Sequence, residues 1–203
     1  MSQASLAGKV ALITGGGGGI GSATALRLAR AGAAIAVTDL FVEKAEMTAD
    51  AIRKEGGRAS AFAVDLGVVS QVQRLMEEVF VSFGRIDILH NNAVLTDPAI
   101  YQKDLKLADM SVSNWDKIFA VNVRAPMLLS KLAIPHMIAQ GGGVIINMSS
   151  GASTKGLPDM LTAYGTSKAA INTLTLYTAA QYGANKIRCN ALVCDAVLTP
   201  SLQ

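Results

Sequence analysis

Short runs of consecutive apolar residues alternate along the chain with longer segments in which apolar residues recur every three or four positions. The short runs predict buried strands, and the longer segments predict helices. The predicted strands span residues 10–13, 34–38, 59–64, 86–89, 144–148 and 187–193, and the predicted helices about 23–31, 43–55, 70–83, 114–140 and 161–182. Strands that are apolar throughout and alternate with helices indicate a parallel sheet covered on both faces, which is the doubly wound α/β class.

The composition agrees with one globular unit. No linker, repeat or low-complexity segment divides the chain, so residues 1–203 are expected to form a single domain. Hydrophobic residues make up 51% of the chain and charged residues only 16%, against about 25% in typical domains, which excludes disorder. Residues 132–154 carry no charge, but Pro135 and three consecutive glycines interrupt them, so we expect no membrane helix there.

Charge and cysteines exclude further classes. The net charge is +3 and the basic residues are scattered, so no nucleic-acid or membrane partner is expected. Cys189 and Cys194 have no partners at metal-site spacing, which predicts reduced thiols and no metal. The first residues lack the apolar core of a signal peptide, and the protein is therefore expected to be cytoplasmic.

A glycine cluster lies between the first predicted strand and the first helix, in the sequence TGGGGGIG of residues 14–21. Glycines at such a junction permit a tight turn and close approach of a pyrophosphate to the free N–H groups of the helix. No Gly-Lys-Ser/Thr follows, which excludes a P-loop. Five consecutive glycines could also form a merely flexible loop, but their place at a strand–helix junction favours dinucleotide binding.

Asp39 ends the second predicted strand. A carboxylate at this point can accept hydrogen bonds from the adenosine ribose hydroxyls and would repel a 2′-phosphate. Leu40 and Phe41, which follow it, offer no cation. We therefore expect NAD rather than NADP, the alternative being a solvated aspartate that closes a strand.

Tyr164 and Lys168 stand four residues apart in a predicted helix and so lie on one face of it. An ammonium group near a phenol favours the phenolate, which makes such a pair a usable proton donor and acceptor. Alone, this spacing usually marks a surface pair. Ser149 and Ser150, however, follow the fifth predicted strand and are expected at the same edge of the sheet as the glycine cluster.

Together these motifs resemble the short-chain dehydrogenase/reductase family, over residues from about 8 to 200. The resemblance rests on the order and spacing of Thr14-Gly15-x-x-x-Gly19-x-Gly21, Asn91-Asn92-Ala93, Asn122, Ser150 and Tyr164-x-x-x-Lys168. It implies a Rossmann fold and an oxidoreductase that transfers a hydride between NAD(H) and a secondary alcohol or ketone.

The resemblance also implies the roles of four catalytic residues. Tyr164 is the general acid/base, and Lys168 favours its ionisation and holds the nicotinamide ribose. Ser150, rather than Ser149, binds the substrate oxygen, and Asn122 holds a water that links Lys168 to solvent. By the same resemblance the cofactor-binding residues are Gly15, Gly19, Ile20, Gly21, Asp39, Asp65, Leu66, Asn92, Ala93, Tyr164, Lys168 and Thr199.

The sequence departs from the family pattern in three places. Val94 replaces a common Gly, and Cys194-Asp195 replaces a Pro-Gly beside the nicotinamide. Family members generally continue for several tens of residues beyond Gln203, so the resemblance implies a C-terminally incomplete domain that lacks the last strand and helix. The second and third departures favour an alternative function, an NAD-binding sensor or interaction module without turnover.

The resemblance further implies a homodimer or homotetramer. Family members commonly pair across the two helices predicted at residues 114–140 and 161–182. Both segments carry little charge, as expected of helix faces that a partner covers.

Overall fold

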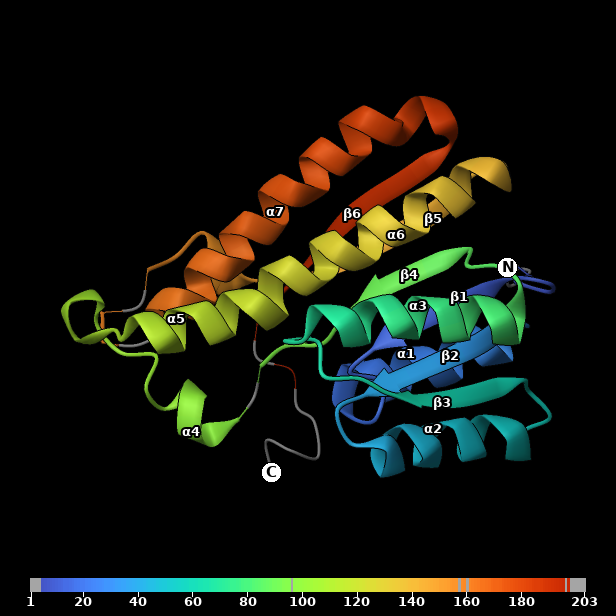
Figure 1. Ribbon diagram of the computed structural model, residues 1–203, viewed down its shortest axis with the longest axis horizontal. Coiled ribbons are helices and arrows are strands. Elements are labelled where there is room, and N and C mark those ends of the chain that lie inside the picture. Colours follow the sequence, from blue (N-terminus) through green and yellow to red (C-terminus); the bar gives the residue numbers. More distant parts are fainter. Residues whose placement is uncertain (1–4, 96, 157, 160, 196, 198–203) are drawn as a thin grey trace.

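The computed structural model describes residues 5–95, 97–156, 158–159, 161–195 and 197, whose strands join in one parallel sheet. The strand order is β3-β2-β1-β4-β5-β6 (Figure 1). The strands are β1 Val10–Thr14, β2 Ala34–Asp39, β3 Ala59–Ala63, β4 Ile88–Asn91, β5 Gly143–Ser150 and β6 Ile187–Cys194. The order reverses direction between β1 and β4, and this confirms the doubly wound Rossmann fold.

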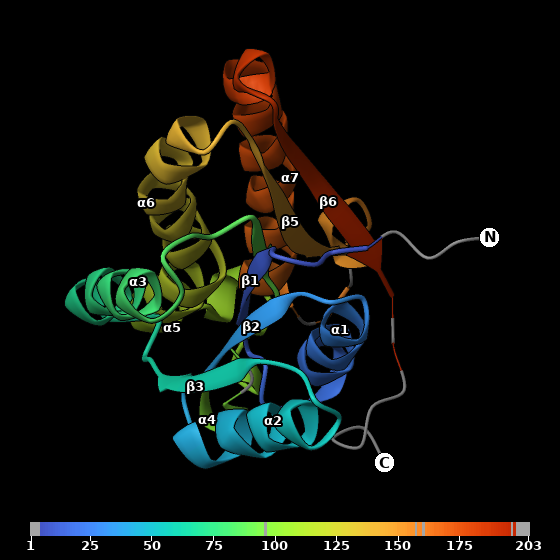
Figure 2. The same cartoon turned by 90° about the vertical axis from the view of Figure 1, so that its right-hand side faces the viewer.

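Helices cover both faces of the sheet. α1 (Gly19–Arg30) and α2 (Val42–Lys54) lie on one face, and α3 (Val69–Phe83), α6 (Ala125–Ala139) and α7 (Thr162–Tyr182) lie on the other (Figure 2). Successive β1 side chains serve opposite faces: Leu12 packs in the core beneath α3 and α6, and Ile13 in the core beneath α1 and α2. Burial on both faces explains why the strands read as uninterrupted apolar runs.

Several predicted elements differ from the structure in their bounds, and α1 begins at Gly19, four residues before the predicted helix. The fourth strand is displaced by two residues, because the Asp87 carboxylate accepts the main-chain N–H of Val10 and bonds of Lys9 and Arg85, and so closes the turn before β4. The predicted helix 114–140 is three pieces, namely α5 (Val112–Phe119), a π-helical turn (Ala120–Arg124) and α6. Ser111 begins it earlier than predicted, since its hydroxyl accepts the N–H of Asn114.

The helical run Val112–Ala139 has the length and apolar composition of a membrane span, a test that core helices also pass. Here it packs against α3 and α7 as a layer of the fold. Between β4 and α5 the chain also forms the short helix α4 (Pro98–Tyr101), which no periodic pattern of apolar residues predicts.

Candidate active site

The glycine cluster forms the turn between β1 and α1. Gly15 and Gly19 have φ values of 62° and 50°, in the left-handed region that glycine adopts without strain. A Cβ on Gly21 would lie 2.1 Å from the main-chain oxygen of Gly15, so α1 can start this close to β1 only with glycine there. Among the described residues other than its chain neighbours, none has an atom within 4 Å of a Cβ built on Gly18, which leaves that side of the turn open.

The first turn of α1 is suited to hold a pyrophosphate. Its N-cap residue, Gly18, makes no side-chain capping bond, and Ile20 lies in the turn itself. The first N–H groups of a helix have no partner within it, and the helix dipole adds positive potential there. The open approach and the uncapped N–H groups together fit a dinucleotide.

Asp39 lies beside this turn at the end of β2. Its Oδ2 accepts the main-chain N–H of Gly17 at 3.1 Å, and its Oδ1 accepts that of Phe41 at 3.2 Å. A Cβ on Gly17 would lie 2.8 Å from Asp39 Oδ2 and 2.5 Å from Lys44 Cβ. The fold thus brings the Lys44 side chain beside the glycine turn, with its Nζ 4.9 Å from the centre of the Phe41 ring, a neighbour that consideration of Leu40 and Phe41 alone missed.

Thr14 at the end of β1 and Asn92 just after β4 brace the glycine turn. The Thr14 hydroxyl accepts the main-chain N–H groups of Asn92 and Ala93, both at 3.1 Å, and donates to the main-chain oxygen of His90. Asn92 Nδ2 donates to the main-chain oxygens of Thr14 and Gly15. The Asn92 side chain therefore holds the turn, and Thr14 is a site residue that sequence reasoning left without a role.

The remaining predicted cofactor residues lie beyond β3 and β6. Asp65 Oδ1 accepts the main-chain N–H of Gly67 at 2.8 Å, which orders the turn after β3. The Leu66 side chain is buried in the core, so only its main chain can face a ligand. Thr199 lies outside the described residues.

Tyr164 and Lys168 lie in the first two turns of α7. Lys168 is 4% exposed, and its Nζ lies 5.6 Å from the centre of the Tyr164 ring. Nζ donates a 2.8 Å hydrogen bond to the main-chain oxygen of Met148 in β5. Burial lowers the pKa of Lys168 to about 8. An ammonium has three N–H donors, so two remain for other acceptors.

The two serines at the end of β5 have different surroundings. Ser149 is buried, and its hydroxyl donates to the main-chain oxygen of Lys168. Ser150 is half-buried, and its Oγ accepts the main-chain N–H of Ala152, which leaves its O–H able to donate. This difference supports the preference for Ser150 as the substrate-binding serine.

Asn122 lies in the π-helical turn. Such turns are frequent at functional sites. Its Oδ1 accepts the main-chain N–H of Leu95, and its Nδ2 donates to Ser167 Oγ. Ser167 Oγ in turn donates to the main-chain oxygen of Tyr164. The Asn122 side chain thus ties the segment after β4 to the helix that carries Tyr164 and Lys168.

Asp195 reaches the same edge of the sheet. A Cβ on Gly151 would lie 2.0 Å from Asp195 Oδ1, so the carboxylate lies directly against Gly151, one residue beyond Ser150. The departure from the family pattern therefore places a carboxylate beside the candidate catalytic serine.

His90 is unsuited to act as a base. It is 2% exposed at the end of β4, and neither ring nitrogen has a partner among the described residues. Burial lowers its pKa to about 4, so the ring is neutral near neutral pH. Within the described chain, no three His, Cys, Asp or Glu side chains are grouped as metal ligands.

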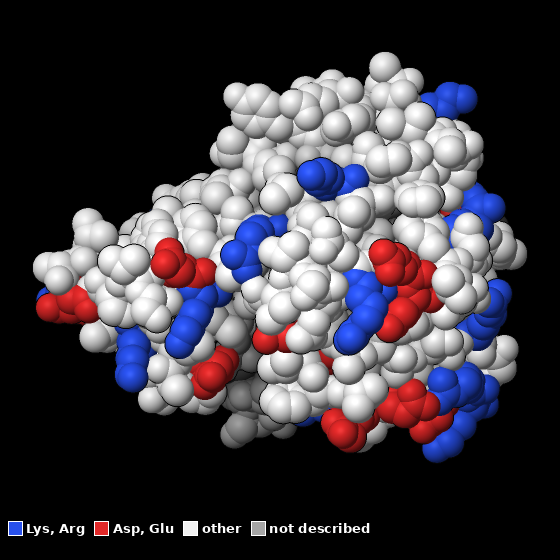
Figure 3. Space-filling view, in the orientation of Figure 1, with Lys and Arg blue, Asp and Glu red and all other residues white. Residues whose placement is uncertain are grey.

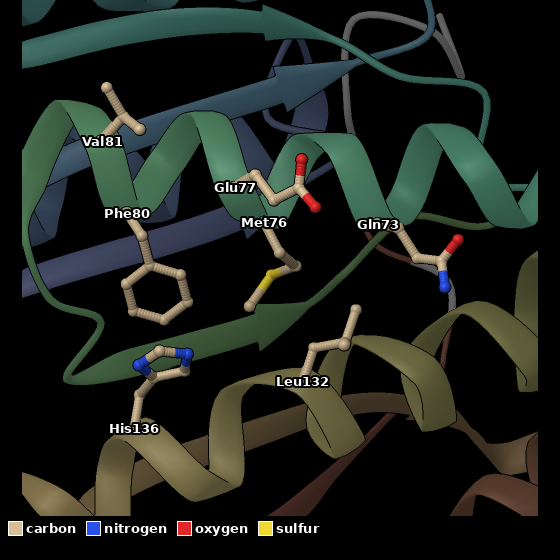
Figure 4. A pocket seen from close by; sticks show the side chains of 7 residues that line it. All are labelled: Gln73, Met76, Glu77, Phe80, Val81, Leu132 and His136. Atoms are coloured by element: carbon tan, nitrogen blue, oxygen red, sulfur yellow. The ribbon is translucent and has the colours of Figure 1, made fainter.

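A surface groove of about 580 Å³ lies elsewhere, between α3 and α6. Figure 4 shows Met76 and Phe80 of α3 facing Leu132 and His136 of α6, with the Phe80 and His136 rings stacked at 3.8 Å. None of the predicted catalytic or cofactor-binding residues that the structure describes lines it.

Comparison with known proteins gives consistent matches. A family model described as short chain dehydrogenase matches residues 9–203. The 2,5-dichloro-2,5-cyclohexadiene-1,4-diol dehydrogenase of Sphingobium indicum is 39% identical over 199 residues, covering 98% of this chain and 76% of that protein.

Two solved structures resemble the fold. A xylitol dehydrogenase bound to NAD⁺ gives a TM-score of 0.85 at 37% identity, covering 94% of this chain and 71% of that one. A metagenomic short-chain oxidoreductase in complex with NADP gives a TM-score of 0.86 at 34% identity, and the match covers 94% of this chain and 84% of that one.

Proposed function

The chain belongs to the short-chain dehydrogenase/reductase family, and from this premise we propose that it transfers a hydride between NAD(H) and a secondary alcohol or ketone. One observation carries the proposal. Tyr164 and Lys168 lie at the start of α7, and Ser149 and Met148 bind Lys168 from the end of β5, next to Ser150. A proton-transfer pair and a hydroxyl donor thus lie at the carboxyl edge of the sheet, where the glycine turn also lies.

When bound, the nicotinamide would supply the hydride acceptor or donor for the carbinol carbon of the substrate. Tyr164 takes the hydroxyl proton as the alcohol becomes a ketone and gives it back in the reverse direction. Ser150 donates a hydrogen bond to the substrate oxygen and holds it near the Tyr164 phenol. Lys168 supplies positive charge beside that phenol and two N–H donors for the cofactor ribose.

Asn122 keeps α7 aligned with the segment after β4 through Leu95 and Ser167. A water held at Asn122, which would link Lys168 to solvent, belongs to the same proposal. Gly15, Gly19, Ile20 and Gly21 would receive the pyrophosphate at the start of α1.

We propose NAD rather than NADP because the Asp39 carboxylate stands where the adenosine ribose hydroxyls would bind. Asp65, Leu66, Asn92, Ala93 and Thr199 complete the proposed cofactor site. Solved relatives of this fold include one with NAD⁺ and one with NADP, so the preference depends on the charge at Asp39 itself.

We also propose that α6 and α7 pair with a second copy of the chain. Leu176 and Tyr177 of α7 are 70% and 63% exposed, and Met127 of α6 is 41% exposed. The part of the surface around α7 in Figure 3 shows few charged side chains. Burial against a partner would remove this apolar surface from water.

One observation favours the alternative of an NAD-binding module without turnover. The Asp195 carboxylate lies against Gly151, beside Ser150, and adds negative charge where a substrate alkoxide would form. An assay of the purified chain with NAD, NADP and a panel of secondary alcohols and polyols separates the two functions. NADH formation supports the dehydrogenase, whereas calorimetric NAD binding without NADH formation supports the module.

A further inference from the structure

The helix that carries Tyr164 has no cap of its own. α7 begins at Thr162, and the preceding residue, Leu161, has a side chain that cannot accept a hydrogen bond. Leu161 also adopts the left-handed conformation, with φ at 65°, which is uncommon for a leucine. The N–H groups of the first turn, Tyr164 among them, therefore need an acceptor from elsewhere in the fold.

Asp104 supplies that acceptor from a distant segment. Its Oδ1 accepts the main-chain N–H of Ala163 and its Oδ2 accepts that of Tyr164, both at 2.8 Å. Asp104 is 1% exposed, so these bonds are shielded from water. The negative carboxylate also complements the positive end of the α7 dipole.

Two further bonds join the same segments. The main-chain oxygen of Asp104 accepts the N–H of Leu161 at 2.7 Å, and that of Leu105 accepts the Thr162 hydroxyl at 2.7 Å. The bond to Leu161 helps to hold that residue in its left-handed conformation. The segment 104–105, here called the template, thus accepts the hydrogen bonds that position the start of α7.

The template is itself fixed to the rest of the fold. Asn114 of α5 is buried and donates from Nδ2 to the main-chain oxygen of Ile100 in α4, four residues before Asp104. α5 leads directly into the turn that carries Asn122. The first turn of α7 is therefore positioned from two sides, by Asn122 through Ser167 and by Asp104.

We propose that Asp104 is a positioning residue for Tyr164. The Asp104 carboxylate replaces a local helix cap and determines where the first turn of α7 holds the Tyr164 phenol. This inference rests on the proposed function of Tyr164 as the general acid/base. Lys168 lies one turn further along α7, so loss of the cap would displace Tyr164 relative to Lys168 and Ser150. Small displacements of a reacting group lower the rate steeply.

The test compares Asp104→Ala and Asp104→Asn with a matched control, Asp97→Ala. Asp97 Oδ1 also accepts a helix N–H, that of Ala99 in α4, but Asp97 is exposed and, within the described residues, has no bond to α7. For Asp104→Ala we expect kcat to fall by about 10- to 100-fold, while the NAD dissociation constant changes by less than about threefold. Asp104→Asn keeps one acceptor and should recover part of kcat, and Asp97→Ala should match the wild type.

The proposal would be overturned if kcat fell equally in Asp104→Ala and Asp97→Ala. It would also be overturned if the fall in kcat of Asp104→Ala were matched by an equal fall in its NAD affinity. If Asp104→Ala does not fold, Asp104→Asn decides by the same comparison of kcat with NAD affinity. Amide hydrogen exchange separates this inference from the proposed function. If the wild type oxidises no alcohol, the proposed function fails, and the cap stands only if Ala163 and Tyr164 exchange faster in the Asp104 variant than in the wild type.

Discussion

The Nζ atom of Lys168 donates a 2.8 Å hydrogen bond to the main-chain oxygen of Met148, which joins α7 to β5 behind the candidate active site. Lys168 is 4% exposed and burial lowers its pKa to about 8, so the fold keeps a charged group in an unfavourable environment near neutral pH. A site that tolerates such a cost is typical of function rather than of stability.

Lys168→Met should therefore stabilise the protein while abolishing turnover. Methionine fills similar space without a charge to desolvate, and we expect the free energy of unfolding at pH 7 to rise by about 1–3 kcal/mol. Urea denaturation measures this change, and NADH formation measures the activity. A destabilised variant would show that the bond to Met148 outweighs the cost of burying the charge.

Thr14 and Thr38 are buried register partners in β1 and β2, with opposite hydrogen-bonding states. Thr14 Oγ1 binds two main-chain N–H groups, whereas Thr38 Oγ1 has no partner among the described residues. Thr14→Val should lower the free energy of unfolding by about 1–3 kcal/mol and weaken NAD binding. Thr38→Val should be neutral or stabilising, because it removes an unsatisfied hydroxyl. Equal effects of the two substitutions would contradict the bracing role of Thr14.

The charges of Asp39 and Lys44 should set cofactor preference together. Asp39→Asn keeps an acceptor for the N–H of Gly17 but removes the charge that opposes a 2′-phosphate. The Lys44 side chain starts beside the same turn with its Nζ over the Phe41 ring, and a rotation of this side chain would let it attract the phosphate. We expect NADP affinity to rise at least about tenfold relative to NAD affinity, a change of about 1.4 kcal/mol. Adding Lys44→Met should cancel most of that gain in calorimetric titrations; if it does not, Lys44 has no part in cofactor binding.

His90 should make stability depend on pH. Its pKa of about 4 in the fold lies below its ordinary value of 6.5, so the unfolded chain binds more protons between these pH values. The free energy of unfolding is then highest above pH 6.5 and falls by up to about 3 kcal/mol as the pH drops toward 4. His90→Leu should flatten this dependence, and His136→Leu, at an exposed position, should leave it in place. The measurement is urea denaturation at several pH values. If the free energy of unfolding of His90→Leu still depends on pH as in the wild type, His90 is not the source of this dependence.

The sequence was sufficient to predict the sheet and the residues at its carboxyl edge. Strands buried on both faces leave continuous apolar runs, and residues 34–38 and 187–193 fall within β2 and β6. The glycine turn and the Tyr164–Lys168 pair could also be predicted, because local rules of turn geometry and helical spacing govern them. The fold class and family are confirmed by the strand order and by the matching family model.

The parts that could not be predicted depend on contacts between distant segments. Asp104 lies outside any periodic pattern, and its partners Ala163 and Tyr164 are some sixty residues away along the chain. Lys44 comes next to Gly17 only because α2 folds back over the turn. The sequence places Asn122 in a helix, but the π-helical turn and the bonds to Leu95 and Ser167 arise only from tertiary packing.

The most direct test of the proposed chemistry compares the wild type with Tyr164→Phe. Both proteins are titrated with NAD by calorimetry and assayed for NADH formation on an alcohol that the wild type oxidises. We predict a fall in kcat of at least about 100-fold, well beyond any loss of NAD affinity from the missing hydroxyl, because the phenolic proton carrier is lost. NADH formation at the same rate by both proteins would contradict the account.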